Sequence, residues 1–150
     1  MNQVITAEEL LTEAELRAVR EAIGAAEKRT SGEIRVHLED HIEEEVLDHA
    51  AFIFEELGMH RTRDRNGVLI YLSVADRKLA VIGDEAINQQ VPENFWNDVL
   101  GLLKLHLAAG RPAHGLVEAV HMVGEKLRIH FPLKHDDTDE LPNEVSFGRR

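Results

Sequence analysis

The chain has 150 residues, which is enough for one domain with a real hydrophobic core. Its hydrophobic fraction of 43% and charged fraction of 30% are ordinary for a globular protein and argue against wholesale disorder. The formal net charge of −11 argues against a nucleic-acid partner, because phosphate contacts need a basic surface, and it favours cation binding. The absence of cysteine excludes disulfides, thiolate metal sites and cysteine nucleophiles.

No apolar stretch approaches the roughly 18 residues that a membrane-spanning helix needs, so direct membrane insertion is not expected. The first residues, Met1 to Thr6, have neither the basic region nor the apolar core of a signal peptide. We therefore expect a cytoplasmic location.

The first half of the chain predicts helix, strand and helix in turn. Two capping boxes, Thr6 with Glu9 and Thr12 with Glu15, open the first helical region, which ends at Ser31-Gly32. Alternating apolar residues predict a strand over 33–38 with one buried face. An acidic loop over 39–45 then leads to a helix over 46–57 that Gly58 ends.

The next segments predict a mixed sheet. The apolar run 67–72 is typical of a central strand covered on both faces. The turn Ala75-Asp76 is so short that the returning strand, 77–83, must be antiparallel to it. The strands 33–38 and 67–72 are joined through a helix, so they are most simply parallel with a right-handed crossover.

The remainder is predicted to be helical, with a short helix over 84–90 and amphipathic helices over 93–109 and from Pro112 to Pro132. The fold class is therefore α/β, a three-layer α/β/α sandwich with a small mixed sheet. Residues 1–132 form the domain, and residues 133–150 form an extended, acidic C-terminal tail.

This topology predicts that three polar segments meet at one edge of the sheet. Glu33, the loop Asp64-Arg65-Asn66 and the turn Gly83-Asp84-Glu85 lie at the ends of three strands that should converge. Such oxygen donors suit hard cations, Ca²⁺ or Mg²⁺, and a bound ion can neutralise a substrate phosphate. Arginines of the same loop can bind phosphate oxygens in a bidentate way. These arginines are Arg61, Arg63 and Arg65.

Each of these residues also has a structural interpretation. Asp84 is a good N-cap for the helix that follows it, and Asn66-Gly67 is a common turn dipeptide. Glu33 can pair with an arginine of a neighbouring strand. Taken singly the residues favour the structural role, and only their convergence favours a site.

Other polar residues give weaker signals. At the opposite sheet edge, Glu39, Asp40 and Asp76 are typical of solvated loops. The nine histidines show no zinc-ligand motif, so we expect surface or half-buried side chains. Serine hydrolysis has no sequence support, because no serine lies in a G-x-S-x-G context. The serines concerned are Ser31, Ser73 and Ser146.

Three segments together resemble a known family. They are Thr30-Ser31-Gly32-Glu33-Ile34, Arg65 to Tyr71 and Asp76-Arg77-Lys78 leading to Ile82-Gly83-Asp84. In order and spacing they resemble the TPM domain family, as do Val91 to Trp96, Phe131-Pro132 and Glu140-Leu141-Pro142. The resemblance implies an α/β/α sandwich, divalent-cation binding, calcium especially, and a phosphatase or nucleotide-hydrolysing activity.

The resemblance also implies an acidic site at Glu33 and Asp84, with Asn66 beside them. The commoner bacterial pattern has a glycine-rich loop after the third strand, whereas this chain has the segment from Gly83 to Ile87. The ligand set therefore differs in part from that pattern.

Two functions remain open at this stage. The first is a metal-dependent phosphohydrolase in which Glu33 and Asp84 hold the ion, Asp64 and Asn66 complete its shell, and Arg63 or Arg65 contacts phosphate. Its weakness is the lack of a clear nucleophile or base, for which His60 is the nearest candidate. The alternative is a non-catalytic, calcium-stabilised binding module that assists assembly or repair of partner proteins.

Overall fold

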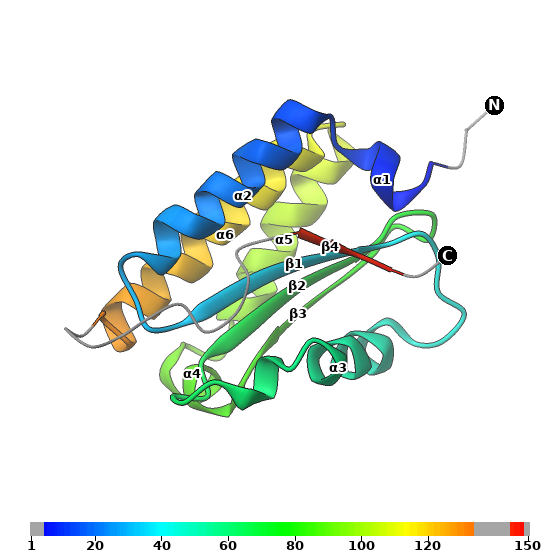
Figure 1. Cartoon of the computed structure of the whole chain (residues 1–150). Helices are drawn as coiled ribbons and strands as arrows, with labels where there is room; N and C mark the ends of the chain where they lie inside the picture. Colours follow the sequence, from blue (N-terminus) through cyan, green and yellow to red (C-terminus); the bar gives the residue numbers. More distant parts are fainter. Residues whose placement is uncertain (1–4, 134–144, 149–150) are drawn as a thin grey trace.

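The structure is a computed structural model that describes residues 5–133 and 145–148. Its centre is a four-stranded sheet in the order β3-β2-β1-β4 (Figure 1). The strands are β1, Glu33–Glu39; β2, Gly67–Ser73; β3, Lys78–Gly83; and β4, Val145–Phe147. β1 and β2 are parallel and β2 and β3 are antiparallel, so the predicted mixed sheet is confirmed. β4 pairs with β1 in parallel. It is a fourth strand that the sequence did not predict.

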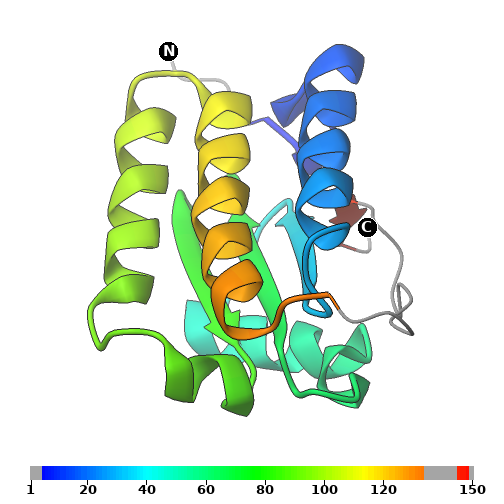
Figure 2. The same cartoon turned by 90° about the vertical axis from the view of Figure 1, so that its left-hand side faces the viewer.

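Helices cover both faces of the sheet. One face carries α2, Glu13–Glu27; α5, Phe95–Ala108; and α6, Pro112–His130. Figure 2 shows these three helices side by side, with α6 in the middle. The other face carries α3, Val46–Glu56, and the sequence-based fold class is thereby confirmed (Figure 1). The short helices are α1, Ala7–Leu10; the 3₁₀ helix η1, Met59–Arg61; and α4, Glu85–Gln90.

The alternation of side chains along the strands explains these layers. Ile34, Val36 and Leu38 of β1 point into the larger core, which the three-helix layer closes. Every residue of β2 is buried, as expected for a central strand with helices on both faces. Leu69 and Tyr71 of β2 belong to the smaller core beneath α3.

The two capping boxes each open a helix of their own, which corrects the expectation of a single helical region. Thr12 Oγ1 accepts a hydrogen bond from Glu15 N at 3.1 Å, and Glu15 Oε1 accepts one from Thr12 N at 2.9 Å. Leu11 separates α1 from α2 in an extended conformation, with φ −117° and ψ 140°. The second helix also ends earlier than expected, at Glu27.

The predicted boundary between the domain, residues 1–132, and the C-terminal tail, residues 133–150, stays a prediction. The acidic run over 136–140 lies outside the described residues. Beyond it, Val145 of β4 is buried against the larger core, and Gly148 N donates to Leu38 O at 2.9 Å. Within residues 5–133 and 145–148, the structure contains no helix long and apolar enough to cross a membrane.

Candidate functional site

The three predicted segments meet at the edge where β1 and β2 begin and β3 ends. Glu33 pairs with Gly67 across β1 and β2, and Val68 pairs with Gly83 across β2 and β3. Backbone hydrogen bonds extend this pairing beyond the strands, with Asp84 N donating to Gly67 O at 2.9 Å and Ala86 N to Arg65 O at 3.0 Å. The convergence that the topology predicted is therefore present.

Asp64 and Asn66 are joined through Ser31, which was not among the predicted site residues. Ser31 Oγ donates to Asp64 Oδ2 at 2.9 Å, and Asn66 Nδ2 donates to Ser31 Oγ at 3.0 Å. Ser31 precedes β1 by two residues, which brings its hydroxyl to the same edge as the loop before β2. Its position just before a strand, within the segment Thr30 to Ile34 that resembles the family, was the signal that could have drawn attention to it.

Asn66 is fully buried, yet one of its polar atoms has no hydrogen bond. Its backbone N donates to Thr62 Oγ1 at 3.3 Å and its side-chain amide nitrogen bonds Ser31, but Oδ1 has no partner among the described residues. A buried carbonyl oxygen without a partner costs free energy, and such an atom commonly faces a bound water or ion. The Oδ1 atom is thus a natural ligand position.

Asp84 makes the most direct ionic contacts at this edge. Arg65 Nε lies 2.8 Å from Asp84 Oδ2 and Arg65 Nη2 lies 2.9 Å from Asp84 Oδ1, a bidentate pair. Asp84 Oδ1 also accepts from Glu85 N at 2.8 Å, so the predicted N-cap of α4 is confirmed. The hydrogen bond to Asp84 raises the pKa of the Arg65 guanidinium. The ligand role of Asp84 and the phosphate role of Arg65 stay predictions.

Glu33, the remaining predicted ligand, is 2% exposed at the start of β1. Within the described part of the chain, no three His, Asp or Glu side chains lie close enough to hold a metal ion between them. A cation at this edge would therefore need fewer carboxylates, completed by the amide oxygen of Asn66 and by water. That is an ordinary ligand set for Ca²⁺ or Mg²⁺.

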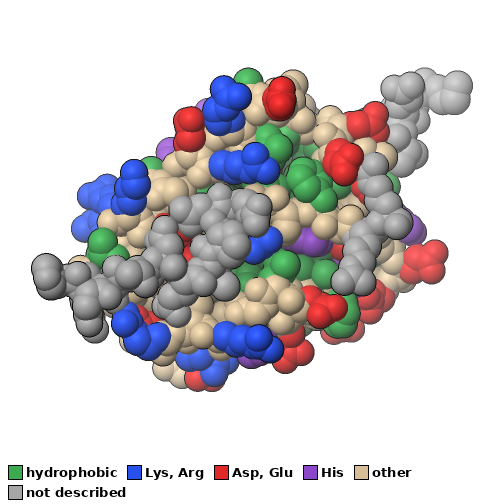
Figure 3. All heavy atoms as spheres, viewed as in Figure 1, with side chains coloured by type: hydrophobic (Ala, Val, Ile, Leu, Met, Phe, Trp, Pro, Cys, Tyr) green, Lys and Arg blue, Asp and Glu red, His purple; other side chains and the backbone are tan. Residues whose placement is uncertain are grey.

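Basic side chains lie among the carboxylates of the same edge. In Figure 3, Asp and Glu predominate at the end of the molecule where β1 ends, whereas Lys and Arg lie mainly over the other half, from the helical layer downward, with some Asp and Glu among them. Arg61 is exposed, and the Arg63 side chain is 53% exposed with Nη2 3.4 Å from Asp64 Oδ2. The edge therefore carries both signs of charge, with Arg65 paired to Asp84 and Glu85 and with Arg63 beside Asp64.

His60, the candidate for proton transfer, lies in η1 and is half-buried. Its Nδ1 atom is buried and has no hydrogen-bond partner among the described residues. No described hydrogen bond links it to Asp64, Asn66 or Asp84, so a role in catalysis stays a prediction.

The opposite edge differs from what the sequence analysis expected. Glu39 is the last residue of β1 and only 8% exposed, so it is not a solvated loop residue. Asp40 Oδ1 accepts from Ala7 N at 2.6 Å, and Asp76 accepts from Ser73 Oγ at 2.5 Å and Ile42 N at 2.8 Å. Both loop aspartates hold the backbone of neighbouring segments in place.

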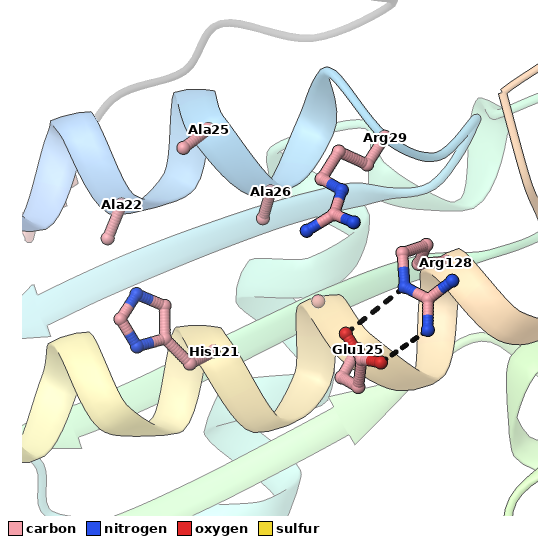
Figure 4. Close-up of a pocket in the computed structure, with 8 residues that line it drawn as sticks. Ala22, Ala25, Ala26, Arg29, His121, Glu125 and Arg128 are labelled. Carbon is pink, nitrogen blue, oxygen red and sulfur yellow. Dashed lines mark hydrogen bonds and ion pairs between the residues drawn. The ribbon is translucent and has the colours of Figure 1, made fainter.

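A groove of about 290 Å³ lies on the helical layer, between α2 and α6 (Figure 4). Its floor is made of small residues because the two helices approach closely, and a Cβ at Gly124 would lie 2.9 Å from Ala26 Cβ. Arg128 Nε bonds Glu125 Oε2 at 3.2 Å on the rim, so that arginine is already neutralised. The groove follows from helix packing and is remote from the polar edge.

Comparison with known proteins agrees with this architecture. A sequence model of the TPM domain family matches residues 4–126 of the chain. The NMR structure of BA42 protein from the psychrophilic bacterium Bizionia argentinensis is similar, with 45% identity and a TM-score of 0.87 over 94% of this chain and 97% of that one. A search of curated proteins finds no match.

A more distant structure shares the fold alone. It is the N-terminal domain of a protein from P. gingivalis, with 18% identity and a TM-score of 0.66 over 85% of this chain and 84% of that one. The family match spans most of the 150 residues and contains the whole polar edge from Ser31 to Glu85. The chain belongs to the TPM domain family.

Proposed function

We propose that the chain is a divalent-cation-dependent phosphohydrolase whose centre is the edge formed by Ser31, Asp64, Asn66 and Asp84. The observation that carries the proposal is the buried Oδ1 atom of Asn66, which has no hydrogen-bond partner among the described residues. It belongs to an amide already bonded to Ser31, which in turn bonds the carboxylate of Asp64. An amide oxygen and a carboxylate held together in this way supply oxygen ligands of the kind that Ca²⁺ and Mg²⁺ prefer.

The arginines supply the second requirement, which is recognition of the phosphate. Arg63 and Arg65 are about half exposed and extend from the loop that carries Asp64 and Asn66. Asp84 and Glu85 hold the guanidinium of Arg65, whose Nη1 lies 3.4 Å from Glu85 Oε1, so the side chain is oriented before any substrate arrives. The guanidinium fork suits phosphate oxygens better than the point charge of a lysine.

A cation in this position would neutralise charge on the phosphate and lower the pKa of a bound water. The role of the chain itself is to orient the ion and the substrate. Asp64 and Asn66 would hold the ion, with Glu33 at the start of β1 as a further carboxylate. Arg63 and Arg65 would bind the phosphate oxygens.

Calorimetric titration of Ca²⁺ and Mg²⁺ into metal-free protein tests the cation site. We expect saturable binding that Asp64→Asn and Asn66→Ala weaken at least about tenfold. Asp98→Asn is the matched control, because Asp98 is exposed on α5 and lies beside Met122 and Lys126 of α6 on the helical layer. Equal binding by all four proteins would contradict the site.

The catalytic part of the proposal needs a separate measurement. Hydrolysis of nucleotides and phosphomonoesters should require the cation, and Asp84→Asn should abolish turnover while the protein stays folded. Saturable binding and a raised melting temperature without turnover would instead favour the non-catalytic, calcium-stabilised module, since a ligand that binds only the folded state stabilises it.

A further inference from the structure

A second polar cluster lies at the other end of β1, away from the proposed cation site. Ser146 of β4 is the register partner of His37 in β1, and its Oγ is 2.8 Å from His37 Nδ1. The other ring nitrogen, Nε2, is 3.2 Å from Glu39 Oε1. Hydroxyl, imidazole and carboxylate thus follow one another in the order of a Ser–His–acid triad, with the two ring nitrogens exchanged relative to the usual arrangement, because Nδ1 faces the hydroxyl and Nε2 faces the acid.

The sheet itself explains why these three side chains meet. His37 and Glu39 are two residues apart on one strand, so they lie on the same face of the sheet. Ser146 lies beside His37 on the neighbouring parallel strand, although 109 residues separate the two in sequence. The triad exists only because β4 adds to the edge of β1.

The imidazole has the protonation state that a general base needs. His37 is 3% exposed, and this burial lowers its pKa from 6.5, so the ring is neutral near pH 7. In the tautomer that fits the contacts, Nε2–H donates to Glu39 and Nδ1 accepts the Ser146 hydroxyl. The titratable or charged groups that face His37 are Glu39 and Arg35 of β1, His49 of α3 and Tyr71 of β2, while β4 contributes Ser146.

The carboxylate is held in place by a second imidazole. His49 Nε2 lies 3.2 Å from the same Glu39 Oε1 atom, and His49 Nδ1 contacts Glu44. The ring of Tyr71 stacks on His37 with centroids 5.7 Å apart and meets the edge of His49 at 5.8 Å. These contacts restrict the rotamers of His37 and Glu39, which is what a triad acid and base require.

The serine is more accessible than the residues behind it. Ser146 is half-buried, whereas His37 and Glu39 are buried. Phe52 of α3 is 54% exposed, and its ring lies 5.9 Å from that of His49. Phe52 therefore offers an apolar surface beside His49, next to the cluster.

We propose that Ser146, His37 and Glu39 form a hydrolytic triad that acts on small carboxylic esters. Ser146 Oγ bonds to the carbonyl carbon while its proton moves to His37 Nδ1, and the alcohol leaves with that proton. Water then bonds to the acyl carbon and gives a proton to His37 Nδ1, which returns it to Ser146 as the carboxylic acid departs. Burial has the largest effect on the pKa of His37, and the positive charge of Arg35 on the same strand lowers it as well.

Covalent labelling of the wild-type chain tests the nucleophile without relying on any variant. We expect a fluorophosphonate probe to release fluoride and attach to Ser146, as located by peptide mass spectrometry. Ser146→Ala should remove the label, and Ser73→Ala should retain it, because Ser73 is fully buried and bonded to Asp76. An unlabelled Ser146 in the wild-type protein overturns the proposal and leaves its hydrogen bond the role of holding β4.

The base has its own readouts. His37→Gln should slow labelling at least about 100-fold. In the wild-type protein the rate should fall on acidification with an inflection below pH 6.5, and an inflection above that value overturns His37 as the base. A metal chelator should leave the labelling unchanged, so failure of this triad and failure of the cation-dependent site are distinguishable.

Discussion

Arg65 binds both carboxylate oxygens of Asp84, with nitrogen–oxygen distances of 2.8 and 2.9 Å. The contact joins the loop before β2 to the N-cap residue of α4, and the two residues are 19 positions apart in the sequence. The same carboxylate accepts a hydrogen bond from Glu85 N, so it caps the helix as well. Because Asp84 both binds Arg65 and caps α4, it holds the loop that also carries Asp64 and Asn66 against the start of that helix.

Substitutions at Asp84 should separate its two structural roles. Asp84→Asn removes the charge that Arg65 binds but keeps an oxygen that can cap α4. Asp84→Ala removes both, and we expect it to cost about 1 kcal/mol more in the free energy of unfolding. Urea unfolding of the two variants measures the difference. Equal stabilities would show that the cap contributes nothing.

Gly83 should be intolerant of a side chain because β3 ends against Trp96. A Cβ at this position would lie 2.4 Å from Trp96 Cζ2, so Gly83→Ala should destabilise the fold by about 1–3 kcal/mol. Gly101→Ala is the matched control, since Gly101 has open space around it on the exposed side of α5. That change should instead stabilise the protein, by up to about 1 kcal/mol. Thermal unfolding of both variants tests the contrast, and equal shifts would contradict it.

Ser31→Ala should weaken both stability and cation binding. The substitution removes the hydroxyl between Asp64 and Asn66 and leaves the Asn66 amide nitrogen without its present acceptor. A buried donor that loses its partner costs about 1–3 kcal/mol. Chemical unfolding without metal measures the loss of stability, and calorimetric titration measures the loss of cation binding. A variant as stable as the wild type would mean that water replaces the hydroxyl without loss.

Asp76 should make the stability depend on pH in the acid range. Hydrogen bonds from Ser73 and Ile42 lower the pKa of Asp76 in the folded protein. The resulting stabilisation is fully present above the pKa of the unfolded chain, near 3.8, and is lost as the pH falls through the lower folded value. Asp76→Asn should therefore be less stable than the wild type at pH 7, and the gap should narrow towards pH 3. A gap that is constant with pH would contradict this linkage.

Most of the fold could be predicted because its signals are local. The alternation in β1, the apolar run of β2 and the short turn before β3 each lie within a few residues, and together they determine the mixed sheet. β4 has only three residues, and its partner strand lies over a hundred residues earlier. Nothing in the segment Val145–Phe147 alone indicates a strand, which is why it was described only as extended.

The proposed site could be predicted only in outline. Strand directions were sufficient to bring Glu33, Asn66 and Asp84 to one edge, because topology decides which strand ends meet. The pairing of Arg65 with Asp84 and the bridging hydroxyl of Ser31 depend on side-chain rotamers and distances. The position of Glu39 was misleading, because it resembles a residue of the acidic loop that follows but is buried at the end of β1.

The most direct test of the central claim is phosphate release from a phosphomonoester by metal-free protein, before and after Ca²⁺ or Mg²⁺ is restored. Wild type and Asp98→Asn should gain activity with the metal, whereas Asp64→Asn should stay at least about tenfold lower. Activity that needs no cation, or that Asp64→Asn retains in full, would contradict a cation-dependent phosphohydrolase at this edge of the sheet.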